Sequence, residues 1–424
     1  MPKHTKYLPR FADRIIREKL ASSGAVLIRG PKSCGKTFTA EQIAGSELLV
    51  DTDSRVKEYM DVDPSLALRG ATPRLLDEWQ VYPQLWNYVR REIDSRQAKG
   101  QFLLTGSATP EDSANIHSGA GRFSIYRMRT LSRSELGWSL AQVSLADLLE
   151  PGAAPDFGSA EECVYTIDEV VRQIVTGGWP NLLKASLEES VHFARDYIEI
   201  TSETDIARVG EVKRDPVKVK RFLRSFARNI ATQAAVTSMV EDTKGDDASF
   251  SDVTAYSYIE ALERLMIIEN LPAWDTHIRS RIALRTTPKR HFVDPSLAVG
   301  ALELTADDLL NDLEYTGFLF ESSVIRDLRV YSDMSGADVS FFRDAKGREV
   351  DAIVQRGDGR WAGFEIKLGD ARIDEGANAL LTLENILDHG RTPPASSLNV
   401  ITSSGFPYRR NDGVNVIPIC LLTA

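Results

Sequence analysis

Short apolar runs alternate with segments of helical period in the first third of the chain. The runs occupy residues 25–28, 47–51, 73–78, 101–107 and 123–128, and residues 37–43 have the spacing of a helix. Strands that alternate with helices form a parallel sheet covered on both faces, with ligands bound at the carboxyl ends of the strands. The pattern therefore predicts a parallel α/β domain in residues 1–140.

Helical patterning dominates the middle of the chain, residues 141–300. Prolines and glycines among small residues predict a surface excursion or linker at 141–162. Helices are expected at 166–174, 187–200, 217–235 and 251–266, the last of them capped by Ser251 and Asp252, and a strand-like stretch follows at 267–271. Helices followed by a strand and a basic loop suggest a winged-helix unit.

The last part of the chain, residues 301–424, predicts a second α/β domain with a mixed sheet. A helix around 317–321 precedes strand-like stretches at 339–343, 349–354 and 361–367, a helix at 374–387, and strands at 399–402 and 414–419. The turn Gly357-Asp358-Gly359 joins two of these strands into a hairpin.

Composition is that of an ordinary globular protein with more than one core. A chain of 424 residues suggests two or three domains. No apolar run approaches the length of a membrane span, so we expect no membrane partner. The three cysteines lie far apart, which predicts neither a disulfide framework nor a zinc site and points to a reducing, cytoplasmic location. The net charge of −10 argues against wholesale binding to nucleic acid.

Residues 30–37 match the phosphate-binding loop pattern Gly-x-x-x-x-Gly-Lys-Ser/Thr at every fixed position. The loop follows a predicted strand and opens a predicted helix, a context that gathers backbone N–H groups around an anion. Lys36 is expected to reach the β- and γ-phosphates of ATP, and the Thr37 hydroxyl to ligate Mg²⁺. The predicted nucleotide-binding residues are Gly30, Pro31, Lys32, Ser33, Cys34, Gly35, Lys36, Thr37 and Phe38.

The strand at 73–78 ends in two carboxylates, a Walker B pattern. Asp77 is predicted to hold Mg²⁺ through water, and Glu78 to orient and polarise the water that attacks the γ-phosphate. A charged strand end exposed to solvent is the plain alternative. The strand at 101–107 ends in small polar residues; Ser107 is predicted to sense the γ-phosphate with Thr105 in reserve, although either hydroxyl could merely cap the following loop.

Arg122 closes the segment Gly119-Ala120-Gly121-Arg122 before the last strand of the domain. It is interpreted either as an arginine finger for a neighbouring subunit, which implies a homo-oligomer, or as a sensor of the bound phosphate. A surface arginine in a glycine-rich loop is an equal alternative.

Two basic groups lie in the middle of the chain: Lys213, Arg214, Lys218, Lys220, Arg221, Arg224 and Arg228, then Arg279, Arg281, Arg285, Lys289 and Arg290. The second group is expected on a wing against the phosphate backbone of DNA, unless both groups are solvated surface. The helix that would read bases offers several acids and only Arg264 as a cation, so base-specific reading is disfavoured.

The hairpin near the C-terminus carries Asp351 on its first strand and Glu365 and Lys367 on its second. Because side chains alternate along a strand, Glu365 and Lys367 share one face. Carboxylates with a lysine are the residue types of a magnesium-dependent nuclease: the acids hold the metal and the lysine stabilises charge at the phosphate. Glu321, from the preceding helix, is expected to complete the metal site. An exposed hairpin with an ion pair is the alternative.

These motifs together resemble one family, the prokaryotic AAA-type ATPases whose C-terminal domain of unknown function is similar to restriction-endonuclease-like folds. The resemblance is carried by residues 29–37, Asp77-Glu78-Trp79-Gln80, residues 104–107, Gly121-Arg122, Gly177-Gly178-Trp179-Pro180, residues 291–295 and the Gly-x-x-Phe-Glu at 317–321. It implies an ATPase with a winged-helix middle and a nuclease-like C-terminal domain.

Two hypotheses follow. The first is an ATPase that couples magnesium-dependent hydrolysis to DNA binding or cleavage by the C-terminal domain. The second is a nucleotide-switched regulatory or scaffold protein that binds nucleic acid or a protein partner without cleavage, which the acidic net charge favours.

Overall fold

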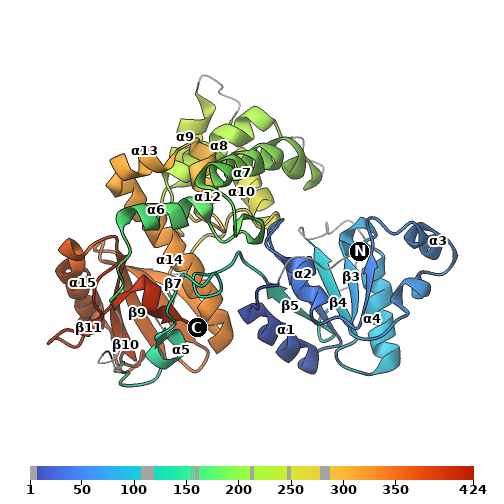
Figure 1. Ribbon diagram of the computed structural model, residues 1–424, viewed down its shortest axis with the longest axis horizontal. Coiled ribbons are helices and arrows are strands. Elements are labelled where there is room, and N and C mark those ends of the chain that lie inside the picture. The colour runs from blue at the N-terminus through green and yellow to red at the C-terminus, as the bar shows by residue number, and fades with distance from the viewer. Residues whose placement is uncertain are drawn as a thin grey trace. The chain divides into compact units, whose positions relative to one another are not determined.

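The computed structural model describes residues 7–106, 119–153, 155, 157, 162–210, 214–245, 250–276 and 287–424. The chain divides into two compact units (Figure 1). The first comprises residues 1–130, 206–212 and 261–266, and the second comprises 131–205, 213–260 and 267–424. The middle and C-terminal parts thus share one compact unit, while domain boundaries at 140 and 300 stay predictions.

The first unit is built on the predicted parallel sheet. Its strands are β1 (Ala25–Arg29), β2 (Ser46–Leu49), β3 (Arg74–Asp77), β4 (Phe102–Gly106) and β5 (Phe123–Arg127), in the order β2-β3-β4-β1-β5 with every pair parallel. Strand β4 therefore lies between the strands that carry the two Walker motifs. All five strands fall within about two residues of their predicted bounds.

The helices that alternate with these strands are α1 (Phe11–Ser22), α2 (Lys36–Glu41), α3 (Arg55–Val62) and α4 (Leu85–Arg96). Helix α4 buries Leu85, Trp86, Val89 and Ile93 at helical spacing against the apolar side chains of β1 and β4. Each fully buried side chain of this size contributes about 1.5–3 kcal/mol. This apolar stripe of α4 fixes the sheet that presents the phosphate-binding loop.

The second unit begins with helices. They are α5 (Leu145–Leu148), α6 (Ile167–Thr176), α7 (Leu187–Ile200), α8 (Pro216–Arg228), α9 (Val236–Lys244), α10 (Asp252–Arg264, in this unit to Glu260), α12 (Ser296–Leu302), α13 (Ala306–Asn311) and α14 (Leu313–Ser335). The helix predicted at 217–235 ends early, because α8 stops at Arg228 and Ala231 has a left-handed φ of 58°. Such a conformation interrupts a right-handed helix.

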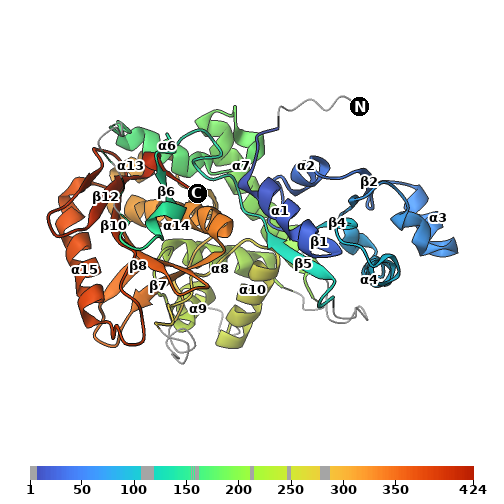
Figure 2. The same ribbon diagram turned by 90° about the horizontal axis from the view of Figure 1, so that it is seen from below.

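The mixed sheet predicted for the C-terminus is present in the second unit. Its strands are β7 (Ala337–Arg343), β8 (Glu349–Arg356), β9 (Trp361–Lys367), β10 (Ser397–Thr402), β11 (Tyr408–Arg409) and β12 (Asn415–Pro418), in the order β11-β12-β10-β9-β8-β7. Strands β8 and β9 form the predicted antiparallel hairpin. Helix α15 (Ile373–Ile386) packs beside β9 and β10, as both ribbon views show (Figure 2).

The strand-like stretch at 267–271 makes isolated bridges rather than a named strand. Ile268 pairs with Phe292 and Leu271 with Lys289, while Ala273 joins Phe341 of β7. Lys289 and Arg290 are only 1% and 4% exposed, so their predicted place on a wing facing DNA is wrong. The other arginines of that basic group lie outside the described residues, and the winged-helix unit stays a prediction.

The first residues of the segment predicted as a linker pack into the second unit instead, in a separate two-stranded sheet. Strand β6 (Val143–Ser144) pairs in parallel with β13 (Leu422–Thr423), and Leu145, Leu148 and Leu149 are buried. The apolar side chains at 143–149, ahead of the prolines and glycines, would have indicated this packing.

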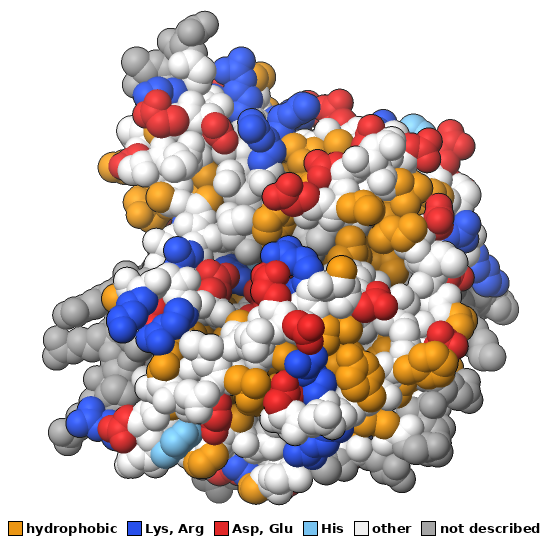
Figure 3. Space-filling model, turned by 90° about the vertical axis from the view of Figure 1, so that its left-hand side faces the viewer, with side chains coloured by type: hydrophobic (Ala, Val, Ile, Leu, Met, Phe, Trp, Pro, Cys, Tyr) orange, Lys and Arg blue, Asp and Glu red, His pale blue; other side chains and the backbone are white. Residues whose placement is uncertain are grey.

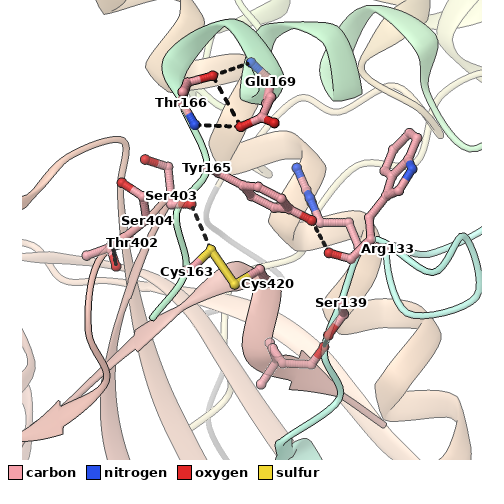
Figure 4. The surroundings of a disulfide bond; sticks show 12 residues. Arg133, Ser139, Cys163, Tyr165, Thr166, Glu169, Thr402, Ser403, Ser404 and Cys420 are labelled. Carbon is pink, nitrogen blue, oxygen red and sulfur yellow. Dashed lines mark hydrogen bonds between the residues drawn. A yellow bond between two sulfur atoms is a disulfide. The ribbon is translucent and has the colours of Figure 1, made fainter. Parts of the chain in front are cut away.

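Cys163 and Cys420 form a disulfide across 257 residues of sequence (Figure 4). The sequence argued against a disulfide framework because its cysteines are far apart, yet folding brings two of them together in this one disulfide. Cys163 is held in place by two backbone hydrogen bonds with Gly405. The cytoplasmic location was inferred from cysteine spacing alone, and the disulfide removes that argument.

Candidate functional site

The phosphate-binding loop connects β1 to α2 with two residues in left-handed conformation, Ser33 (φ 62°) and Gly35 (φ 98°). Gly30 is required by space, because a Cβ there would lie 2.2 Å from the backbone oxygen of Met128. The buried Cys34 packs against the same backbone, with its Sγ 3.9 Å from the Met128 oxygen. The loop is therefore pressed against the chain that leaves β5.

Lys36 is buried beneath this loop, 6% exposed, and its Nζ donates to the backbone oxygens of Gly30 (3.0 Å) and Pro31 (2.8 Å). Arg10, ahead of α1, supports the loop from the other side by donating to the oxygens of Cys34 (3.1 Å) and Arg129 (3.0 Å). The sequence analysis missed Arg10, since no pattern marks a lone arginine before a helix.

Asp77 is the centre of the hydrogen bonds at the strand ends. The Thr37 hydroxyl donates to Asp77 Oδ1 over 2.8 Å, and the Thr105 hydroxyl donates to the same oxygen. The second contact follows from register, because Asp77 on β3 pairs with Thr105 on β4. Ser107 lies outside the described residues, so the structure places the reserve candidate, Thr105, at the site.

The donor set around Asp77 fits a magnesium ion. A threonine hydroxyl and a carboxylate side by side are hard oxygen ligands of the kind that Mg²⁺ takes together with nucleotide phosphates. Thr37 and Asp77 provide this pair in the structure. These two residues would hold the ion.

Glu78 follows Asp77 with a left-handed φ of 52°. A non-glycine residue held in this region costs of order 1–3 kcal/mol, and such residues cluster at active sites. Gln80 donates from Nε2 to the Glu78 carboxylate, and the side chain of Gln80 occupies the space beside Gly106, where a Cβ would come within 2.4 Å of Oε1. Burial raises the pKa of Glu78, only partly opposed by Gln80 and Lys36. Gln80 is thus a positioning residue that the sequence showed only as part of a motif.

Arg122 lies at the amino ends of the parallel strands, away from the carboxyl ends where a phosphate would bind. It precedes β5, and its backbone oxygen accepts from Gly24 and Ala25 at the start of β1, whereas Gly30 follows the end of β1. In a parallel sheet the starts and the ends of the strands lie on opposite sides, so the interpretation of Arg122 as a phosphate sensor is wrong. Arg122 instead pairs with the exposed Asp94 over 2.9 Å.

Two arginines that the sequence analysis passed over lie at the correct edge. Arg29 ends β1 and Arg127 ends β5, and the two are paired in register. Burial and then the charge of Arg127 lower the pKa of Arg29. A bound polyphosphate would relieve this repulsion, which makes both arginines candidates for contact with the nucleotide.

The residues of the predicted nuclease site are brought together in the second unit. Lys367 Nζ lies 2.6 Å from Glu365 Oε2 and 3.8 Å from Asp351 Oδ2. Asp351 Oδ2 also accepts from the backbone N–H of Ile366 over 2.9 Å. Glu321 reaches the same cluster from α14. The sequence placed these four side chains correctly relative to one another.

A fifth residue, Lys289, sits in the middle of the cluster. Its Nζ lies 2.8 Å from Glu321 Oε1, 2.8 Å from Glu349 Oε1 and 3.1 Å from Asp351 Oδ1, and its side chain is 2% exposed. The sequence analysis had assigned Lys289 to a DNA-facing surface. No sequence signal links it to these acids, which lie on later elements of the chain.

Protonation in this carboxylate cluster is set by burial and the lysines. Burial and then Asp351 raise the pKa of Glu321 to about 8 and that of Glu365 well above its ordinary value. Burial works against ionisation of Asp351, but Lys289 and Lys367 hold its pKa below the ordinary value. Burial likewise opposes the charge of Lys289, and the surrounding carboxylates outweigh it and hold its pKa well above normal.

The cluster does not fit a magnesium ion as it stands. Its central position is taken by an ammonium group, and a metal needs deprotonated ligands. Among the residues that the structure describes, no three His, Cys, Asp or Glu side chains are arranged to hold a metal ion.

Comparison with known proteins places three family models along the chain. Residues 22–137 match an AAA domain, residues 167–308 a domain of unknown function (DUF8612), and residues 316–422 another (DUF4143). In the described part of the chain, no helix has the length and hydropathy needed to cross a bilayer.

Among whole proteins, two uncharacterized mycobacterial proteins are similar, Mb2031c of Mycobacterium bovis and Rv2008c of Mycobacterium tuberculosis. Each is 26% identical over 357 residues, which is 83% of this chain and 72% of the relative. A solved structure, the Walker-type ATPase PABY2304 of Pyrococcus abyssi, aligns with 71% of this chain and 98% of its own at 12% identity and a TM-score of 0.41. The AAA match and the Walker geometry agree: residues 22–137 are similar to an AAA domain, and both Walker motifs lie at the carboxyl ends of a parallel sheet.

Proposed function

We propose that the chain hydrolyses Mg·ATP at the site formed by Lys36, Thr37, Asp77 and Glu78, and that the nucleotide state controls binding of nucleic acid by the second unit. The observation that carries the ATPase proposal is the contact of the Thr37 and Thr105 hydroxyls with one oxygen of Asp77. This contact joins both Walker motifs and the intervening strand at the carboxyl edge of the sheet.

Each residue has a role that its contacts support. The Lys36 side chain already points into the loop, where it donates hydrogen bonds to two backbone oxygens. When ATP binds, the same ammonium group can donate to phosphate oxygens instead. Magnesium, when bound, neutralises charge on the β- and γ-phosphate oxygens. Glu78, oriented by Gln80 and with a pKa raised by burial, holds the attacking water and accepts its proton.

Glu78→Gln tests this assignment directly. The variant keeps the shape of the site and the contact with Gln80, so ATP should bind as in the wild type while kcat falls by orders of magnitude. Lys36→Ala should instead weaken binding. Nucleotide binding is measured by calorimetry and turnover by phosphate release. Equal turnover of Glu78→Gln and wild type would remove the general-base assignment.

Nucleic acid is proposed as the partner because of helix α8. Arg221, Arg224 and Arg228 recur at helical spacing on its exposed face. On the face of the molecule drawn in Figure 3, basic and acidic side chains are interspersed. Three phosphate contacts would give a salt dependence of log K with a slope of about −2.7.

The partner proposal is tested with duplex DNA at several salt concentrations, with and without ATP. The Arg221→Glu/Arg224→Glu/Arg228→Glu variant should lose binding and keep the ATPase rate. Asp358→Lys, a charge change on the exposed β8–β9 turn, is the control. Unchanged DNA affinity in the triple variant would refute the role of α8. A homo-oligomer with Arg122 as finger stays a second proposal, tested by sedimentation with and without ATP.

A further inference from the structure

A metal-dependent nuclease site needs a gap between carboxylates that a divalent cation can fill and a phosphodiester can reach. In the second unit the acids are present but the gap is filled by Lys289. Its Nζ has three donors, and Glu321, Glu349 and Asp351 each offer one oxygen at 2.8–3.1 Å. These are N–H···O distances, longer than the roughly 2.1 Å that oxygen ligands take around Mg²⁺.

We propose that the Lys289 ammonium takes the place of the metal ion in the C-terminal carboxylate cluster, so that this cluster binds no divalent cation and cleaves no phosphodiester. The proposal concerns a site other than the ATPase site and does not depend on what the second unit binds. On this proposal the nuclease-like residues form a buried, charge-compensated cluster and not a catalytic centre.

Lys289 is fixed in its position by the backbone. Its N–H donates to the Leu271 oxygen over 3.0 Å and its own oxygen accepts from Leu271 over 2.9 Å, so both sides of the residue are paired. The Lys289 Nζ also lies 5.8 Å from the centre of the Phe341 ring. Withdrawing this ammonium from three acids in a buried site would leave buried charges unpaired, which is strongly unfavourable.

Other oxygens of the cluster are engaged as well. Asp351 uses Oδ1 for Lys289 and Oδ2 for the backbone of Ile366, and Glu365 uses Oε2 for Lys367. A metal ion that took these particular oxygens as ligands would have to compete with these hydrogen bonds.

Access is closed from the side of α15. Glu365 is 4% exposed, and helix α15 approaches its strand at Gly376, where a Cβ would lie 3.1 Å from Glu365 Cβ and 3.3 Å from Lys367 Cε. Because even an added methyl group would be in tight contact here, the space between helix and strand is too small for a phosphodiester. Substrate therefore cannot reach the acids from this side without movement of the helix.

The test is to titrate nucleotide-free protein with Mn²⁺ and count bound ions by electron paramagnetic resonance. All proteins carry Asp77→Asn, which removes the carboxylate of the ATPase site. We expect no bound Mn²⁺ in this background, one bound ion after Lys289→Met, and none again after Lys289→Met/Asp351→Asn. DNA cleavage with Mg²⁺ is measured alongside, using protein without Asp77→Asn.

Three outcomes would overturn the proposal. One is Mn²⁺ binding by the background protein that Asp351→Asn abolishes, and another is Mg²⁺-dependent cleavage by the wild type that Asp351→Ala abolishes. The third is a folded Lys289→Met protein that binds no Mn²⁺, since the lysine would then not be what excludes the metal. If Lys289→Met does not fold, the first two measurements decide, because they use no Lys289 variant.

Discussion

A buried charge network in the second unit is open to a quantitative test at Asp327. This residue of α14 is fully buried and accepts four hydrogen bonds. Two come from Arg133, through Nη1 over 2.6 Å and the backbone N–H over 3.3 Å, and two from Arg326, through Nη2 over 2.9 Å and Nε over 3.1 Å. One carboxylate thus compensates two buried guanidinium groups, and Asp294 further pairs with Arg326 over 3.0 Å.

Asp327→Asn keeps the shape of the side chain and removes its charge. The amide NH₂ must then face either Arg133 or Arg326, so at least one charged hydrogen bond becomes a contact between two donors. A hydrogen bond to a charged group contributes about 1.5–3 kcal/mol. Breaking a buried pair costs about 3–5 kcal/mol because the partner charge stays buried. We therefore expect a loss of about 3–5 kcal/mol in the free energy of unfolding, and a decrease in Tm on the order of 10 °C.

Differential scanning calorimetry with and without a non-hydrolysable Mg·ATP analogue measures this change. The analogue should raise the transition of the ATPase-containing unit by mass action, and Asp327→Asn should lower the other transition. The control is Asp374→Asn, which breaks the pair with Arg410 at a site where Asp374 is 83% exposed. Exposed pairs contribute about 0–1 kcal/mol. Equal effects of the two substitutions would refute the reasoning.

Three further predictions concern the ATPase site and the cysteines. Thr105→Val removes a hydrogen-bond donor to Asp77, so kcat should fall roughly 10-fold or more with little change in nucleotide affinity. A steady-state assay of phosphate release measures this change. Since Glu78 must be deprotonated to act and burial raises its pKa, kcat should fall as the pH decreases through that raised value, above the ordinary 4.5; a pH–rate profile without this acid limb would contradict the role. Unfolded, unreduced protein should expose one reactive thiol, that of Cys34, and three after reduction; three thiols before reduction would exclude the disulfide.

The sequence by itself determined what neighbouring residues encode. The strand before the phosphate-binding loop, the helix that follows it and the carboxylates at the end of β3 are local patterns, and the structure places them as predicted. The hairpin with Asp351 and Glu365 is equally local, since its turn fixes the register of both strands. The position of Arg122 at the opposite edge could also have been read from strand direction alone.

Only the tertiary structure decided which distant residues meet. Lys289 lies 32 residues from Glu321 and 62 from Asp351, and Cys163 lies 257 residues from Cys420. A basic stretch predicts surface because charges are costly to bury, and that expectation fails where folding supplies compensating acids. The carboxylates that the sequence indicates as metal ligands are thus paired with a lysine, because folding places Lys289 from a separate segment between them.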